Sequence, residues 1–307
     1  MSNQPLVSIG LPSYNRASSL RRAIESALTQ DYQNIELVIS DNASTDGTQA
    51  LCLEAGARDG RIKYFRQQSN RGATANFGEV LKRASGEFFM WLGDDDWLDS
   101  SYVSRCLHKL IENPDYSLVC GAAKYYEGGQ FLFDGETLIL PQDSAEQRVL
   151  AYYERVTHNG TFYGLMRRRQ LDGAALPNVM GGDWLLMATI AFKGKIDMVA
   201  GTAVNRSRGG TSKTMKNITA TLGLSDIHAR VPNLSIALAA FEDIAWKSNA
   251  YASLGPAGRL SLAHKVFSVF GRRYFRPYWR SALRPYLGPP FFYAVSVRDK
   301  IRTRYLR

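Results

Sequence analysis

Several features that would assign this chain of 307 residues to a special class are missing. The chain has only 3 cysteines, scattered at Cys52, Cys106 and Cys120, so we expect reduced thiols in a cytosolic compartment rather than a disulfide framework or a metal cluster. No stretch reaches the roughly 18 uncharged apolar residues of a membrane-spanning helix. The first residues lack the basic-then-apolar pattern of a secretory signal. The 4 histidines have no partners at ligand spacing.

Acidic residues are scarce only in the last third of the chain. Residues 216–307 contain 15 Lys and Arg against 4 Asp and Glu, although the net charge of the whole chain is +10. The hydrophobic content of 45% and the charged content of 21% are ordinary for a globular protein, which excludes wholesale disorder. The charge distribution favours an anionic surface as the partner of the C-terminal third.

Strand-like and helix-like segments alternate through the first 122 residues. Short apolar runs predict strands at residues 7–11, 35–39, 62–65, 88–92 and 117–122. Apolar residues at helical spacing predict helices between them, at residues 18–28, 48–57, 73–84 and 100–113. This alternation implies βαβ units, hence an α/β fold with a mostly parallel sheet and helices on both faces.

The pattern is less regular elsewhere. We expect Pro12 to end the first strand, since proline removes a backbone donor. Residues 131–140 suggest a hairpin that turns at residues 134–136, and residues 162–167 read as a strand. Beyond Asn217 the chain is predicted to be helical.

Polar clusters follow three of the predicted strands, at residues 12–16, 41–46 and 94–96. In a parallel sheet, ligands bind outside the carboxyl ends of the strands, so these clusters predict one shared site. The last cluster is Asp94-Asp95-Asp96, whose charges repel one another and call for a compensating cation. Mg²⁺ or Mn²⁺ fits, because either ion takes carboxylate and phosphate oxygens. The alternative is a solvated acidic loop.

Four motifs together resemble glycosyltransferase family 2. They are Leu11-Pro12-Ser13-Tyr14-Asn15-Arg16, the segment from Ser40 to Thr48, Gly93-Asp94-Asp95-Asp96-Trp97 and Gly182-Asp183-Trp184. The resemblance covers residues 5–210. It implies the GT-A fold, a Rossmann-like nucleotide-sugar-binding domain. It also implies transfer of a sugar from a nucleotide diphosphate to an acceptor, usually with inversion and a divalent metal.

The resemblance also implies roles for particular residues. Asp95 and Asp96 are the expected metal ligands. The expected nucleotide-sugar-binding residues are Pro12, Tyr14, Asn15, Arg16, Asp41, Arg71, Asn76, Asp94, Asp95 and Arg208. For Asp41 the alternatives are an Asx-turn and an N-cap. For Arg71 and Asn76 the alternatives are a solvated arginine and an asparagine on a helix face.

Asp183 resembles the family's general base, which removes the proton of the acceptor hydroxyl. Its alternative is the N-cap of the helix that starts near Trp184, whose ring could stack on a sugar or pack in the core. Residues 158–161 could line the acceptor cleft, or His158 could be structural. Arg206 and Arg208 lie in a polar segment with Ser212 and Lys213, which could close as a lid or be an ordinary exposed loop.

The chain divides into a predicted catalytic domain, residues 1–215, and a helical, basic, aromatic-rich region, residues 216–307. From Arg259 to Arg307 there are 12 Lys and Arg and a single acid, interleaved with aromatic residues. This composition suits peripheral attachment to an anionic membrane surface. RNA binding and a basic solvated surface are the alternatives.

The predicted function is that of an inverting, metal-dependent glycosyltransferase. We expect a UDP- or dTDP-sugar donor and a lipid-linked saccharide acceptor at the inner face of the cell membrane, in bacterial surface polysaccharide synthesis. One alternative is a sugar-nucleotide pyrophosphorylase or a dinucleotide-dependent oxidoreductase, although no GxGxxG follows the first strand. The other is a nucleic-acid- or membrane-binding protein on an inactive scaffold.

Overall fold

The computed structural model describes residues 4–136, 138–174, 176–208 and 214–275. Within these ranges, nine strands form one sheet in the order β3-β2-β1-β4-β8-β6-β9-β5, with β7 paired to β6. The strands are β1 (Val7–Ser13), β2 (Ile35–Asp41), β3 (Ile62–Arg66), β4 (Phe88–Trp91), β5 (Trp97–Leu98), β6 (Tyr116–Glu127), β7 (Gln130–Asp134), β8 (Leu165–Arg167) and β9 (Lys195–Ser207).

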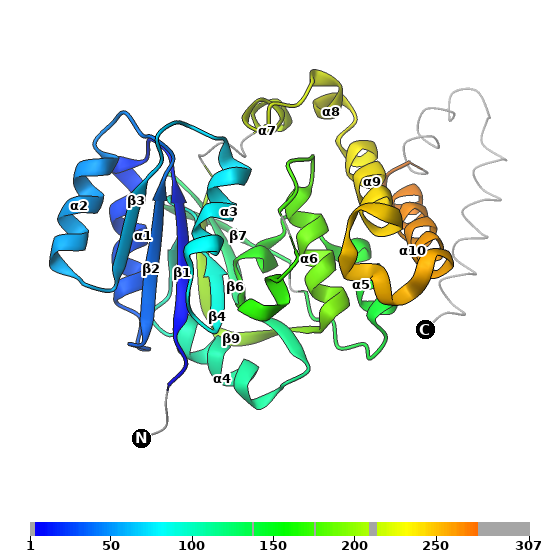
Figure 1. Cartoon of the computed structure of the whole chain (residues 1–307), viewed down its shortest axis with the longest axis horizontal. Helices are drawn as coiled ribbons and strands as arrows, with labels where there is room; N and C mark the ends of the chain where they lie inside the picture. Colours follow the sequence, from blue (N-terminus) through cyan, green and yellow to red (C-terminus); the bar gives the residue numbers. More distant parts are fainter. Residues whose placement is uncertain (1–3, 137, 175, 209–213, 276–307) are drawn as a thin grey trace.

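The pairings make the sheet mostly parallel, as predicted. Strands β1, β2, β3, β4, β6 and β9 run in one direction, and the short strands β5, β7 and β8 run against them. Helices cover both faces (Figure 1). They include α1 (Ala17–Leu28), α2 (Thr48–Arg58), α3 (Ala73–Arg83), α4 (Tyr102–Glu112), α5 (Ala145–Arg155) and α6 (Gly182–Lys193).

Pro12 does not end the first strand, so that prediction is wrong. Strand β1 continues to Ser13, and Pro12 pairs in register with Ser40 of β2. The missing N–H of Pro12 costs no hydrogen bond, because the backbone groups of alternate residues in β1 point to opposite neighbouring strands. Gly10 faces β4 and accepts the last hydrogen bond there, from the N–H of Leu92. Pro12 faces the same side, beyond the end of that pairing.

The hairpin turns earlier than predicted. Strands β6 and β7 are joined at Gly128 and Gly129, which have φ of 56° and 84°. A two-residue turn with both residues in the left-handed region suits glycine, whereas residues 130–134 are held in β7 by pairing with β6.

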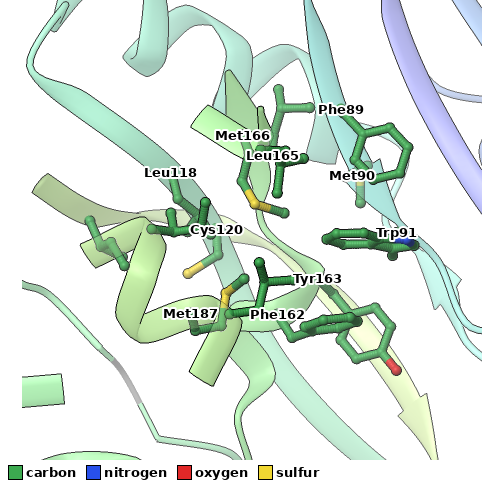
Figure 2. Close-up of a cluster of buried hydrophobic side chains, with 14 of the residues drawn as sticks. Phe89, Met90, Trp91, Leu118, Cys120, Phe162, Tyr163, Leu165, Met166 and Met187 are labelled. Atoms are coloured by element: carbon green, nitrogen blue, oxygen red, sulfur yellow. The ribbon is translucent and has the colours of Figure 1, made fainter. Parts of the chain in front are cut away.

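A cluster of buried hydrophobic side chains packs around β4, β6 and β8 in the middle of the sheet (Figure 2). The ring of Trp91 stacks on that of Phe162 with 4.9 Å between centroids and meets Phe89 edge-on. Phe162 lies in a 3-10 helix, Gly160–Tyr163, so the predicted strand over 162–167 shrinks to β8. The packing of Trp91 on Phe162 therefore fixes the 3-10 helix against β4 at its carboxyl end.

The described part of the C-terminal region consists of helices, as predicted. They are α7 (Met215–Thr221), α8 (Asp226–Arg230), α9 (Pro232–Glu242) and α10 (Gly255–Phe270), with single π-helical turns after α9 and α10. Helix α10 packs on α5 and α9 (Figure 1). Phe270 is buried and contacts Tyr153 and Trp184. Within the ranges given above, no helix has the length and apolar character needed to cross a bilayer.

Most of the basic, aromatic stretch, residues 276–307, lies outside the described residues. The predicted division after residue 215 falls at the first residue of α7. Helices α9 and α10 nevertheless contribute side chains such as Ala240 and Val266 to the same continuous core as the strands.

A buried carboxylate ties the amino-terminal strands together. Glu36 of β2 accepts hydrogen bonds from the Ser8 hydroxyl of β1 and from the backbone and hydroxyl of Ser85, and it forms an ion pair with Lys63 of β3. Burial alone would raise the pKa of Glu36, but these hydrogen bonds outweigh it and lower the pKa from 4.5 to about 2. The folded protein therefore binds the ionised form preferentially.

Substitution Glu36→Gln should lower the free energy of unfolding at neutral pH by about 2 kcal/mol, because charged hydrogen bonds are lost in a buried site. Since the pKa is lower in the folded protein, this stabilisation is present above pH 4.5 and disappears as the pH falls toward 2. Urea titrations at several pH values measure the difference. Glu54→Gln, which removes the carboxylate of an exposed surface ion pair, is the control. It should lower the free energy of unfolding by less than about 0.5 kcal/mol. Equal effects of the two substitutions would contradict the account.

Candidate active site

The segments that follow β1, β2 and β4 meet at the carboxyl edge of the sheet. The backbone N–H of Tyr14 donates to Asp94 Oδ2 over 3.3 Å, and Arg16 Nε lies 3.7 Å from Asp94 Oδ1. Asn15 links the first two segments, since its N–H donates to Ser44 Oγ over 2.9 Å. Its φ of 52° is a left-handed conformation that asparagine tolerates. The structure thus brings together the three polar clusters that the sequence placed at one site.

Asp41 is fully buried and shapes the segment after β2. Its Oδ1 accepts the backbone N–H of Ser44, three residues further on, over 2.8 Å, which is a local contact with the spacing of a cap rather than of an Asx-turn. Its Oδ2 accepts the Tyr64 hydroxyl over 3.0 Å and lies 3.5 Å from Arg66 Nε. These contacts order the loop that would face a nucleoside, and direct binding by Asp41 stays a prediction.

Asn76 and Arg71 differ in their surroundings. The buried amide of Asn76 donates to the carbonyls of Ser13 and Ser40 and accepts from Gln67, so it joins the ends of β1 and β2. Asn76 therefore has the contacts expected of a structural asparagine on a helix face, and both ends of its amide are engaged. The Arg71 side chain is 61% exposed and lies 4.0 Å from Glu79, as a solvated arginine would.

The three acids after β4 have three different surroundings. Asp94 faces Tyr14 and Arg16, as described above. Asp96 is only 2% exposed; its Oδ1 accepts the N–H of Ser207 over 2.9 Å, and its Oδ2 lies 3.6 Å from Arg206 Nε. Asp95 is half-buried, and among the described residues no hydrogen bond reaches its carboxylate. The alternative of a solvated acidic loop is therefore wrong for Asp96.

Burial dominates the electrostatics of this triplet. It raises the pKa of Asp94 to about 7 and the pKa of Asp96 to about 6, and the charge of Asp95 adds to both shifts. Arg16 and Arg206 oppose these shifts. Gly93 makes room for this arrangement, because a Cβ there would lie 2.7 Å from Asp96 Oδ2.

Arg206 is a largely buried cation at the carboxyl end of β9, with its side chain 19% exposed. Its Nη1 donates to the Tyr125 hydroxyl over 3.0 Å, and its guanidinium lies 4.5 Å from the centroid of the Tyr163 ring. Although burial disfavours the charge, Tyr163, Asp96 and Tyr125 raise the pKa of Arg206 above its ordinary value. Its place in a strand contradicts the lid expected for this residue.

Arg208 follows the strand directly. Its backbone N–H donates to Tyr126 over 2.7 Å, and its guanidinium lies 5.7 Å from the centroid of the Phe133 ring. Ser212 and Lys213, the other members of the predicted lid, lie outside the described residues.

A pocket of about 450 Å³ opens beside the triplet. Its polar lining includes Asp183, Asn159, His158, Arg206 and Arg208. Apolar side chains of α6, α7, α9 and nearby loops also line it: Leu176, Pro177, Val179, Met180, Trp184, Met215, Ile218, Leu222 and Ile236.

Asp183 is the second residue of α6. The N-cap is Gly181, with φ of 73° and no side-chain cap, so the capping alternative for Asp183 is wrong. Burial raises the pKa of Asp183, and Asn159 Nδ2 donates to its Oδ2 over 2.7 Å, which opposes the shift. Arg206 also stabilises its charge, so one buried cation serves both Asp96 and Asp183. Trp184 lines the pocket and stacks on Phe270, 6.5 Å between centroids, so its ring packs in the core as one alternative expected.

The sequence offered residues 158–161 as possible cleft residues, and His158 and Asn159 do line the pocket. It did not predict that Asn159 contacts Asp183 directly, although its position before Gly160 is a signal for a left-handed turn. Glu136 accepts hydrogen bonds from the backbone of residues 157–159 and has no signal in the sequence, since only the fold brings it there.

No cluster of three or more His, Cys, Asp or Glu side chains suited to a metal ion occurs in the part of the chain that the structure describes. A divalent ion bound with a diphosphate needs only one or two protein carboxylates. The half-buried carboxylate of Asp95, which no described side chain pairs with, lies between two acids with raised pKa and fits such an ion.

Comparison with known proteins gives a consistent picture. The sequence profile described as "Glycosyl transferase family 2" matches residues 8–173. A glycosyltransferase of Streptococcus pneumoniae, GlyA, is 30% identical over 180 residues, 57% of this chain and 24% of that protein. The Campylobacter jejuni GalNAc(5)-diNAcBac-PP-undecaprenol beta-1,3-glucosyltransferase is 30% identical over 171 residues, 55% of this chain and 53% of that protein. The chain thus spans about a quarter to a half of these relatives.

Solved structures share the fold. Staphylococcus aureus TarS 1-349 superposes with a TM-score of 0.59 at 15% identity, covering 92% of this chain and 75% of TarS 1-349. The mannosyltransferase PcManGT of Pyrobaculum calidifontis, described in complex with GDP-Man and Mn²⁺, gives a TM-score of 0.53 at 16% identity, covering 98% and 81%. At such low identity the likeness concerns the fold alone, and it confirms the predicted GT-A fold.

Proposed function

Because the chain belongs to glycosyltransferase family 2, we propose that it transfers a sugar from a nucleotide-diphosphate donor to a saccharide hydroxyl, with inversion. The observation that carries the proposal is the position of Arg206, which faces both the acidic triplet and the pocket carboxylate Asp183. A donor held at the triplet would present its sugar toward the pocket. An acceptor in the pocket would then meet a base within reach.

The donor would bind at the edge formed by the segments after β1, β2 and β4. Backbone and side-chain donors of the Pro12–Arg16 turn, with Tyr14 and Asn15 at its centre, would face the nucleotide, and Asp41 would order the neighbouring loop. Asp94 would lie near the ribose, and Arg208 would face the diphosphate across the pocket. Arg71 is exposed enough to reach a donor, whereas contact by Asn76 would require its internal hydrogen bonds to break. UDP- or dTDP-sugars are the proposed donors.

A divalent cation, Mn²⁺ or Mg²⁺, is the proposed cofactor, held by Asp95 with Asp96 as the second predicted ligand. The accessible carboxylate of Asp95 supports the first assignment. Asp96 could ligate only by giving up part of its contacts with Arg206 and Ser207. When bound, such a cation offsets the charge that develops on the leaving diphosphate. The solved mannosyltransferase with Mn²⁺ supports this proposal for the fold.

The acceptor is proposed to be lipid-linked, in bacterial surface polysaccharide synthesis. The Campylobacter relative is named for an acceptor on PP-undecaprenol, and its match covers 53% of that protein. The pocket supports this class of acceptor, because apolar side chains line it together with Asp183 and would suit a ligand with an apolar part.

Attachment to an anionic membrane surface is proposed for the C-terminal region. The excess of Lys and Arg there supports it, as do large apolar side chains exposed on or beside α7–α10: Met215, Ile227, Leu234, Leu238, Trp246 and Leu260. The protein would then work at the inner face of the cell membrane. No comparison favours nucleic acid as the partner.

The cation assignment predicts the behaviour of Asp95→Asn. UDP with manganese should raise the melting temperature of the unchanged protein, because a ligand that binds only the folded state stabilises it. Asp95→Asn should lose the manganese-dependent part of this rise, while Asp115→Asn, at a surface ion pair, should keep it. An undiminished manganese-dependent rise in Asp95→Asn would refute the assignment.

The base assignment predicts that Asp183→Asn binds the donor normally but turns over at least about a hundredfold more slowly, since the acceptor proton has no ionised carboxylate to receive it. Asp172→Asn is the control and should leave turnover unchanged. Steady-state transfer assays measure both variants. Near-normal turnover of Asp183→Asn would leave that residue without a catalytic role.

The membrane assignment predicts that the chain cut after Phe275 binds vesicles of phosphatidylglycerol less tightly than the full chain. The cut removes 8 Lys and Arg and one acid while keeping α10, whose apolar side chains belong to the core. Binding of the full chain should weaken with salt and be low on phosphatidylcholine vesicles. Equal partitioning of both chains in a sedimentation assay would count against the assignment.

A further inference from the structure

An ionised carboxylate holds the loop beside the pocket. Glu136 accepts the backbone N–H groups of three successive residues: Thr157 over 3.1 Å, His158 over 2.9 Å and Asn159 over 2.7 Å. The Thr157 hydroxyl donates to it as well, over 2.8 Å. Burial alone would raise the pKa of Glu136, but these hydrogen bonds keep it below its ordinary value. The loop between α5 and the 3-10 helix is therefore fixed by charge-assisted hydrogen bonds.

Asn159 combines a backbone that favours glycine with a side chain that glycine lacks. Its φ is 50°, in the left-handed region, and the residue is 2% exposed. The two ends of its amide are both engaged. Oδ1 accepts the Tyr152 hydroxyl over 3.0 Å, and Nδ2 donates to Asp183 Oδ2 over 2.7 Å. Asparagine tolerates this conformation, so the backbone turn and the two contacts of the amide can be combined at one position.

Several other groups face Asp183. Arg206 from β9 favours its ionised form, and the phenols of Tyr152 and Tyr153 from α5 and of Tyr163 from the 3-10 helix lie near it. His158 and Arg208 line the same pocket. Among the side chains of the described ranges, only Asn159 donates a hydrogen bond to the Asp183 carboxylate.

We propose that Asn159 is a positioning residue that determines which oxygen of Asp183 receives the proton of the acceptor hydroxyl. The proposal rests on the base role given to Asp183 above. With Oδ2 held by the amide, Oδ1 takes the proton while the acceptor oxygen forms its bond to the anomeric carbon. The bond from that carbon to the diphosphate oxygen breaks, and its electron pair leaves with the nucleoside diphosphate. Glu136 and Tyr152 act through Asn159, by fixing its backbone and its amide plane.

The test is Asn159→Gly, which keeps the left-handed backbone and removes only the amide. Turnover at neutral pH should fall roughly tenfold to a hundredfold, because the base is no longer oriented. Loss of the donated hydrogen bond should also raise the pKa of Asp183 further, so the acid limb of the rate profile between about pH 5 and about pH 9 should move to higher pH. The KM for the donor should not change. Asn249→Gly, at an exposed position far along the chain, is the control for the glycine substitution itself.

A merely structural role would lower the melting temperature without moving the acid limb, and an unchanged limb with unchanged turnover would likewise overturn the proposal. If Asn159→Gly does not fold, Tyr152→Phe tests the proposal instead. It removes the hydroxyl that holds the Asn159 amide, so the acid limb of the rate profile should move to higher pH by a smaller amount. Normal turnover of Asp183→Asn would instead show that the base assignment itself fails. An inactive Asp183→Asn beside an unaffected Asn159→Gly would overturn only the positioning role.

Discussion

A carboxylate buried without a cation costs several kcal/mol, and this protein buries Asp96 against Arg206. Tyr125 and Tyr163 contact the guanidinium of Arg206, and the side chain of Asp96 is only 3% exposed, so water can do little to stabilise the Asp96 charge. The position of Arg206 depends on β9 running parallel to β6, which carries its carboxyl end to the edge where β4 delivers the triplet. The direction of one late strand thereby decides whether Asp96 has a cation beside it.

The same pair links two regions that the sequence keeps far apart. Arg206 stabilises the charge of Asp183 as well as that of Asp96, and Asp183 in turn is oriented by Asn159. Donor side and acceptor side therefore share one buried cation. A low-dielectric site strengthens such interactions, and it also makes each of them sensitive to the loss of a partner.

The sequence was informative where function depends on local pattern. Buried runs such as residues 35–39 identified strands, and the polar clusters after them marked the edge that the structure forms. It was misleading where pairing geometry overrides a local preference, as at Pro12, whose missing N–H points past the end of β4. It could not place Arg206, because its contacts Asp96, Tyr125 and Tyr163 come from three segments that meet only in the folded protein. Glu136 was invisible for the same reason, since its role depends on three backbone groups more than 20 residues away.

The central claim is that the acids after β4 bind a diphosphate through a divalent cation while Arg206 keeps Asp96 in place. Manganese anomalous diffraction from a crystal grown with manganese and UDP tests it most directly. The account predicts a manganese peak at the Asp95 carboxylate when UDP is bound. A bound UDP with no manganese beside the triplet, or with Asp95 turned to bulk solvent, would contradict it.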